Sequence, residues 1–403
     1  MVISTLPKTT VPPVPGPNFP QTERQARFLA LAESLAEIAA ANAPKHDRNG
    51  AFPHNTFRAI VDAGYHTLTI PEEMGGMGAS PLETMIAQER LARGDGSVAL
   101  AICMHLGHIY GVATSLEWPD DLRRKLISGV IDNGALYNTA ASEPGLGSPS
   151  RGGAYATTAE WAEDGSWRLN GHKTWTTLAP ALGYVGVGAT VLDGDDDSDS
   201  TEKANFLVPM DAPGVRIDET WDNMSMSATG SHDLLLEDVL VPANHRLPAA
   251  GKPANTPWGI LTSAVYLGIG VAARDFTIAF AKTRQPAALG GEAIATLPNV
   301  QSRIAEIELK LLAARSTLYG AVQQWEEQPE LREALGWQLA GAKVIVTNNA
   351  IGITDQALRV VGAVGLQRQH PLERYFRDVR AGLGNPPLDD VAVGMIGRAV
   401  LGE

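Results

Sequence analysis

The sequence contains very little cysteine and has no surplus of positive charge. Its single cysteine, Cys103, excludes both an intrachain disulfide and a zinc cluster built from cysteines, and the apolar run 98–104 around it predicts a buried thiol. The net charge of -13 argues against a nucleic-acid partner, because phosphate binding requires an excess of Lys and Arg. No uninterrupted apolar run reaches the about 18 residues that a membrane-spanning helix needs. We therefore expect neither nucleic-acid binding nor a membrane span.

Several other patterns are missing as well. The first 20 residues contain six prolines and lack the basic start and apolar core of a secretory leader, so we expect a cytoplasmic protein with a disordered or extended arm at 1–22. His105 and His108 lie three residues apart on an expected helix without a nearby Glu, and we predict no metal site. A serine hydrolase is disfavoured, because the sequence has no Gly-x-Ser-x-Gly motif.

What the sequence does contain divides into three parts after the arm. Residues 23–133 repeat Ala, Leu and Glu at helical spacing, and residues 251–403 contain long helical patterns with few breakers. Between them, residues 134–250 show apolar strands and two hairpin signals, Asp164-Gly165 and Asn170-Gly171. We predict an α+β fold with an N-terminal helical domain, a central antiparallel β domain and a C-terminal helical bundle.

Local signals place some boundaries. Asn55 is expected to cap a helix over 57–63, and Ser80 with Pro81 is expected to start the next one. The acidic stretch 193–202 does not have the spacing of a calcium loop, and we interpret it as a solvated loop.

Three segments contain more hydroxyl groups, small residues and charges than a core requires. Residues 137–148 would let backbone N–H groups approach a ligand, and residues 169–177 place a Trp between threonines, which suits a planar ring. Small residues at 362–365, followed by a charged helix, suggest contact with a ligand or a neighbouring subunit. Each segment also fits an ordinary role: a strand-to-turn passage, half-exposed strand residues, or a helix cap before a salt-bridged helix.

Five collinear motifs resemble those of the acyl-CoA dehydrogenase superfamily. They are PEEMGG at 71–76, SEPGLGS at 142–148, LNGHKTW at 169–175, LEDVLVP at 236–242 and ERYFRD at 373–378. The resemblance covers about residues 23–402 and implies the family's fold, in which the C-terminal domain is a four-helix bundle. It also implies a homo-oligomer, either a dimer or a tetramer.

The resemblance implies FAD, bound between the β domain and the bundle, with a second subunit contributing. Ala141 and Ser142 would contact the pyrimidine side of the flavin, while Trp175 and Thr177 would cover the ring and bond near its N5 atom. The remaining implied sites are Thr139 on the flavin side, Arg284 at the diphosphate of the neighbouring subunit's FAD, Arg359 and Gly362 where the family often has Gln and Gly-Gly, and Ser148 at the phosphate or pantetheine of an acyl-CoA.

The family's usual catalytic carboxylate is absent. In many relatives this base is a Glu eight residues after the Asp of an Arg-Asp pair, and the same count from Asp378 reaches Pro386. The second location that some relatives use, early in the first C-terminal helix, is Trp258. Two interpretations stay open for the nearest carboxylates, Asp389 and Asp390: they are a relocated catalytic base, or they cap the following helix. A third explanation is that another residue, which the sequence does not identify, serves as the base.

The expected function is an FAD-dependent oxidoreductase that oxidises the α,β bond of an acyl-CoA thioester and passes electrons to an electron-transfer flavoprotein. One alternative is a two-component flavin monooxygenase of the same fold, which takes reduced flavin from a reductase, uses oxygen and needs no α-proton base. The other alternative is a catalytically diverged flavin- or CoA-binding protein.

Overall fold

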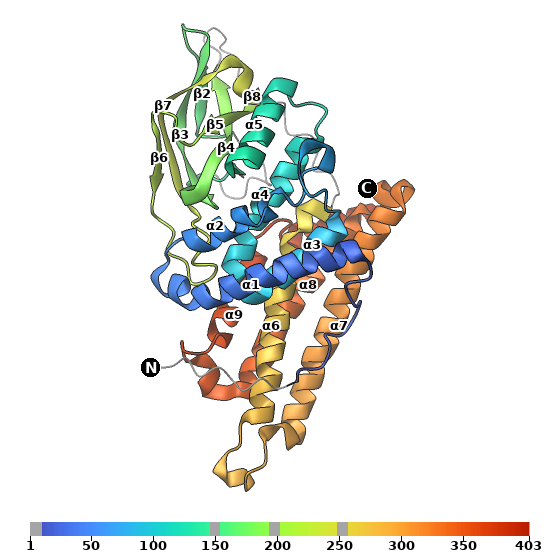
Figure 1. The fold of residues 1–403 in the computed structure, drawn as a ribbon. Helices are drawn as coiled ribbons and strands as arrows, with labels where there is room; N and C mark the ends of the chain where they lie inside the picture. The colour runs from blue at the N-terminus through green and yellow to red at the C-terminus, as the bar shows by residue number, and fades with distance from the viewer. Residues whose placement is uncertain (1–9, 146–153, 193–201, 248–256, 403) are drawn as a thin grey trace.

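The computed structural model describes residues 10–145, 154–192, 202–247 and 257–402. The β domain lies at one end of the molecule, the N-terminal helices cross its base, and the long C-terminal helices extend away from it (Figure 1). This arrangement confirms the predicted order of a helical domain, a β domain and a helical bundle. Ser148 and nearly all of the acidic stretch 193–202 lie outside the described residues.

The N-terminal domain consists of five α-helices. Ser80 starts α3 through a capping box with Glu83, as predicted, and Pro81 occupies the first turn. The prediction for Asn55 was wrong, because the carbonyl of Pro53 already accepts the N–H groups of Thr56 and Phe57 and the helix begins before Asn55. The helices are α1 (Glu23–Asn49), α2 (His54–Asp62), α3 (Pro81–Gly94), α4 (Gly96–Thr114) and α5 (Asp120–Asn133).

The β domain is one mixed sheet in the order β6-β7-β3-β2-β4-β5-β8, with β1 also paired to β4. The prediction of a purely antiparallel β domain was wrong for two strand pairs. Strands β1 and β2 both run parallel to β4, because they follow one another along the same edge of that strand. The strands are β1 (Leu136–Ala140), β2 (Thr158–Trp161), β3 (Ser166–Thr176), β4 (Leu182–Leu192), β5 (Glu202–Pro209), β6 (Val215–Asp218), β7 (His232–Pro242) and β8 (Arg246–Leu247).

Only one of the two predicted hairpin turns is a turn. Asp164 and Gly165 connect β2 to β3, where the Asp164 carboxylate accepts the N–H of Ser166 at 3.0 Å. Asn170 and Gly171 lie inside β3 at a bulge instead. A Cβ at Gly171 would meet the Thr157 hydroxyl oxygen at 2.3 Å, so this glycine permits a close approach and not a turn.

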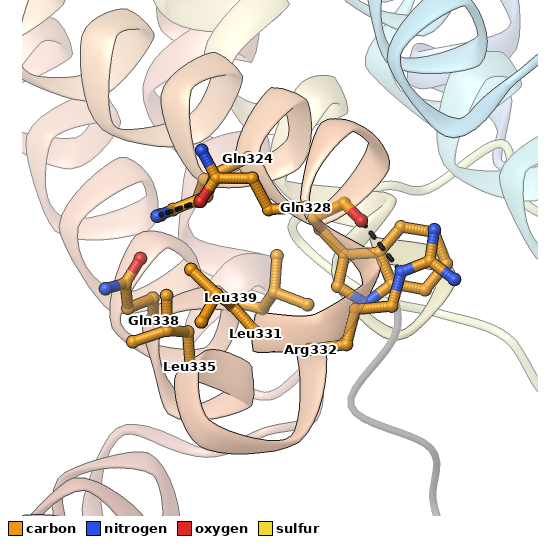
Figure 2. Close-up of a pocket in the computed structure, with 9 residues that line it drawn as sticks. Gln324, Gln328, Leu331, Arg332, Leu335, Gln338 and Leu339 are labelled. Atoms are coloured by element: carbon orange, nitrogen blue, oxygen red, sulfur yellow. Dashed lines mark hydrogen bonds between the residues drawn. The ribbon is translucent and has the colours of Figure 1, made fainter.

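The C-terminal domain contains three long helices and two shorter ones. The chain at 10–21 runs along this domain without helix, and its carbonyls accept hydrogen bonds from Arg274 and Arg315. At the α7–α8 connection the Arg332 guanidinium lies 3.8 Å from the centroid of the Trp325 ring, and the hollow beside it, about 10 Å³, has room for little more than one water molecule (Figure 2). The helices are α6 (Thr262–Thr283), α7 (Pro298–Glu327), α8 (Arg332–Val361), α9 (Leu372–Asp378) and α10 (Asp389–Leu401).

Two helical segments are long and apolar enough to cross a membrane, judged by length and composition alone, although neither is an uninterrupted apolar run. They are Gly96–Thr114 and Pro257–Thr283, and 72% and 83% of their most apolar windows are buried inside the protein. Helices α4 and α6 pack on each other and on α3, which explains an apolar composition without a membrane. Cys103 on α4 is buried, as predicted.

Candidate active site

The two hydroxyl-rich segments come together where β1 and β3 end. The Asn138 side-chain amide donates to the carbonyl of Thr177 at 2.9 Å, and the N–H of Thr174 donates to the carbonyl of Ser142 at 2.9 Å. The structure therefore places the predicted ligand residues Thr139, Ala141, Ser142, Trp175 and Thr177 on two adjacent segments.

A buried ion pair connects the same two segments. Lys173 donates to a carboxylate oxygen of Glu143 at 2.6 Å, and both side chains are almost fully inaccessible to solvent. The Glu143 carboxylate also accepts the N–H groups of Ala156 and Thr157, while the Lys173 ammonium lies 4.3 Å from the Tyr155 ring centroid. Burial lowers the pKa of Lys173 to about 8, and the bond to Glu143 opposes that shift. These two motif residues hold the site together and leave ligand contact to their neighbours.

Trp175 presents a flat aromatic surface to solvent. Its side chain is 66% exposed, although a Trp ring normally buries most of its area. Its backbone has φ of 58°, a left-handed conformation that costs a non-glycine residue free energy. An exposed indole held in this way suits stacking against a planar ring, so the residues present fit a flavin.

A hollow of about 360 Å³ is lined in part by Thr139 and Ala141, two of the predicted ligand residues. His108 of α4 contributes to its lining, and its Nε2 atom lies 3.2 Å from the Thr139 hydroxyl. Burial lowers the pKa of His108 to about 4, so the imidazole is neutral at physiological pH. The hollow is large enough for a small organic molecule beside Thr139 and Ala141, which are predicted to face the flavin.

The sequence indicated only that His108 is not part of a metal site. Its neighbour His105 is structural: its Nδ1 accepts the N–H of Tyr137 at 2.9 Å and its Nε2 lies 2.9 Å from the carbonyl of His66. The three-residue spacing put both histidines near one face of α4, but it could not show which of them reaches a cavity. Within the described ranges, no group of three or more His, Cys, Asp or Glu side chains is placed to hold a metal ion.

The C-terminal loop before α10 has a different character. Pro386 follows Asn385, whose side-chain oxygen accepts the Tyr266 hydroxyl. Trp258 packs its ring 4.3 Å, centroid to centroid, from the ring of Tyr110 on α4. The two family positions for a catalytic base therefore hold an exposed proline and a packed tryptophan, and neither side chain can accept a proton.

Asp389 is the first residue of α10. Its carboxylate accepts hydrogen bonds from Lys343 at 3.1 Å and from Asn348 at 2.8 Å, with one bond to each oxygen. The helix N-terminus adds a favourable interaction for a carboxylate at this position. Asp390 lies beside it in the same first turn. Neither aspartate is a side-chain cap, because Leu388 occupies the capping position.

The bundle residues that the resemblance assigned to FAD lie at helix ends. Arg284 terminates α6, whose last turns lie at the tip of the bundle far from the β domain (Figure 1). Arg359 is in the last turn of α8, and Gly362 follows that helix with φ of 70°. Contact between these residues and a neighbouring subunit's FAD stays a prediction.

The charged motif at α9 ties the bundle to the rest of the protein. Arg377 binds both carboxylate oxygens of Asp47, at 3.0 and 2.7 Å. The buried Asp378 accepts the N–H of Met226 at 2.8 Å, and burial raises the pKa of Asp378 to about 7. This motif therefore fixes the loop before β7, which leads into the site.

Comparisons with known proteins agree with this arrangement. The sequence models for the N-terminal, middle and C-terminal domains of acyl-CoA dehydrogenases match residues 22–116, 138–239 and 260–384. The protein named "Putative acyl-CoA dehydrogenase YdbM" from Bacillus subtilis is 41% identical over 380 residues, which cover 93% of this chain and 97% of that protein. Amino sugar nitrososynthase DnmZ from Streptomyces peucetius is 28% identical over 395 residues, which cover 90% of each chain.

Among solved structures, KijD3 in complex with FMN and dTDP-3-amino-2,3,6-trideoxy-4-keto-3-methyl-D-glucose superposes with a TM-score of 0.80 and 26% identity, covering 95% of each chain. The family thus includes proteins named as dehydrogenases and proteins that act on amino sugars. The chain belongs to the acyl-CoA dehydrogenase family of flavin-dependent oxidoreductases.

Proposed function

We propose that this protein is a monooxygenase that uses reduced flavin and molecular oxygen. The observation that carries the proposal is the occupancy of the two base positions by Pro386 and Trp258. Removal of the α proton of a thioester requires a group that accepts a proton, and neither side chain can do so. Asp389 is engaged at both oxygens by Lys343 and Asn348, which supports a structural role for it.

The flavin side of the site supports the same proposal. Trp175 offers a stacking surface, and Thr177 offers a hydroxyl at its edge. The bound flavin would be FAD by the family resemblance, or FMN, which the KijD3 complex contains. When bound, the reduced flavin supplies two electrons; one atom of oxygen goes to the substrate and the other leaves as water. A reductase would regenerate the reduced flavin.

The chain's own contribution would be to hold and enclose the reactants. The hollow beside Thr139 accepts an organic molecule, and the neutral His108 can donate or accept one hydrogen bond there. A neutral imidazole does not repel a cationic substrate such as an amino sugar. Association into a homo-oligomer would complete the flavin site through Arg284 and the end of α8.

A second candidate is α,β-dehydrogenation of an acyl-CoA. The specific observation in its favour is the 41% identity to the protein named as an acyl-CoA dehydrogenase. This function would require Asp389 or Asp390 to reach the substrate and would pair the protein with an electron-transfer flavoprotein. The Lys343 ion pair would then have to open.

Labelled oxygen distinguishes the two candidates. The protein is mixed with chemically reduced FMN or FAD, ¹⁸O₂ and a panel of amines, amino sugar nucleotides, aromatic heterocycles and acyl-CoA thioesters. We expect one class to gain a single ¹⁸O atom, as detected by mass spectrometry, with no gain when protein is omitted. Desaturated acyl-CoA in place of any labelled product would overturn the proposal in favour of dehydrogenation.

A further inference from the structure

A row of hydroxyl groups leads from the flavin-facing residues into the protein interior. The pairing of Thr176 with His232 in the sheet brings Thr177 beside Ser231. The hydroxyl oxygens of these two residues lie 2.9 Å apart, and the Ser231 oxygen lies 2.7 Å from that of Thr229. Thr229 in turn donates to the carbonyl of Met226 at 3.0 Å. Three hydroxyls and one carbonyl therefore form a continuous chain.

The direction of the protons along this chain follows from the bond that the Thr229 hydroxyl donates to the Met226 carbonyl. Each hydroxyl has one proton, and the Met226 carbonyl can only accept. Thr229 therefore gives its proton to Met226, Ser231 gives its proton to Thr229, and Thr177 gives its proton to Ser231. The reverse order would set the lone pairs of Thr229 against those of the Met226 carbonyl at 3.0 Å, where Thr229 is only 1% exposed and water cannot compensate.

The inner end of the chain is held firmly. The N–H of Met226 donates to Asp378 at 2.8 Å, and its carbonyl also accepts the indole N–H of Trp221 at 3.0 Å. Met226 has φ of 53°, so these bonds hold it in a conformation that a methionine seldom adopts. The carbonyl is therefore presented to Thr229 by contacts from two separate parts of the chain.

We infer that Thr177 offers only lone pairs to its ligand and therefore selects the reduced flavin over the oxidised one. The N5 atom of a reduced flavin carries a proton and donates a hydrogen bond, whereas N5 of an oxidised flavin only accepts one. This inference rests on the proposed function, because it takes the N5 edge of the flavin to lie at Thr177. Ser231 and Thr229 are positioning residues: they act by fixing the Thr177 proton.

The test is a pair of anaerobic binding measurements. The dissociation constants of oxidised and reduced FMN, and of oxidised and reduced FAD, are measured for the wild type, Ser231→Ala and Ser225→Ala. The wild type is expected to bind the reduced form more tightly. Ser231→Ala frees the Thr177 proton to bond an oxidised N5, and we expect the preference for reduced flavin to fall about tenfold.

Ser225→Ala is the matched control. Ser225 lies in the same loop and donates its backbone N–H to Asn223, a bond that alanine keeps. We expect its preference to equal that of the wild type. Thr177→Val, which removes the accepting oxygen, is expected to lose the preference as Ser231→Ala does. Equal melting temperatures would show that these variants are folded.

Two results would overturn the inference. One is a preference that Ser231→Ala leaves unchanged, and the other is the absence of a preference, or of flavin binding, in the wild type. Neither measurement needs turnover. A protein that shows the tenfold change but transfers no labelled oxygen would refute the proposed monooxygenase and retain the proton order.

Discussion

The end of the β domain that carries Trp175 and Thr177 and the C-terminal loop before α10 differ in how they are built. At the first, a buried ion pair, backbone bonds and a row of hydroxyls hold Trp175 and Thr177 in place. At the second, Pro386 occupies one position of a base, and the Asp389 carboxylate of the Lys343–Asp389 pair is partly exposed. The other base position, before α6, holds the packed Trp258. In this chain, a firmly held surface that is predicted to bind the cofactor therefore occurs together with base positions that hold no proton acceptor.

The largest expected effect is on the free energy of unfolding, when the lysine of the ion pair in each region is removed. Lys173→Met leaves the Glu143 carboxylate buried without its cation, and we expect the free energy of unfolding to fall by about 3–5 kcal/mol. Lys343 is buried too, but Lys343→Met leaves behind an Asp389 carboxylate that is 35% exposed and hydrated, so the loss should not exceed about 1 kcal/mol. Urea denaturation measures both. A larger loss for Lys343→Met would reverse the comparison.

The second effect depends on pH and concerns Asp378, which holds the loop before β7 through the N–H of Met226. The pKa of Asp378 is about 7 in the folded protein and 3.8 in the reference state, so the folded state binds more protons between these values and loses stability as pH rises through that window. Asp378→Asn keeps an acceptor for Met226 and cannot ionise. The stability of this variant relative to the wild type should therefore increase from pH 5 to pH 8, by about 3 kcal/mol.

Urea denaturation of Asp378→Asn and of the wild type across this pH range provides the measurement. The difference between the two proteins isolates the one carboxyl group, because the other groups titrate in both. A difference that stays constant with pH would show that Asp378 ionises normally.

A third effect is on cofactor binding alone. Trp175→Ala should weaken flavin binding about tenfold through lost stacking, while the free energy of unfolding changes by less than about 0.5 kcal/mol because the ring is 66% exposed. The matched control is Trp161→Ala, which removes another exposed Trp of the β domain at the β2–β3 hairpin. Fluorescence titration with FMN and FAD measures both. Equal losses of affinity would show that Trp175 does not contact the flavin.

The smallest expected effect is in the C-terminal loop. Asp389→Asn and Asp390→Asn should each change the rate of oxygen transfer by less than about threefold, because the proposed reaction needs no carboxylate there. A catalytic base would lose about 100-fold or more. Steady-state kinetics with the labelled-oxygen assay decides between these values.

The sequence was sufficient for the fold class, and it singled out two segments that the structure brings together. Helical and alternating periods predicted the order of the domains, and the described part of the first motif, 142–145, lies beside residues 173 and 174 of the second. The sequence could not show that Glu143 and Lys173 pair with each other, because they lie 30 positions apart and a buried ion pair leaves no local pattern.

Other features depended on tertiary contacts. Asn170-Gly171 has the composition of a turn, but the pairing of β3 with β7 and the close approach of Thr157 override that local preference. The parallel pairings of β1 and β2 with β4 also follow from chain direction, which periodicity does not report. The spacing of His105 and His108 could not show that His108 lines a cavity, because that cavity forms between α4 and the sheet.

The central claim is that this flavin site has no base for the α proton of a thioester, and one anaerobic titration tests it most directly. The protein loaded with oxidised flavin is mixed with acyl-CoA thioesters of short, medium, long and branched chains while the visible absorbance of the flavin is recorded. We predict that the absorbance stays unchanged with every thioester. Bleaching of the flavin by any one of them would contradict the claim and identify a dehydrogenase.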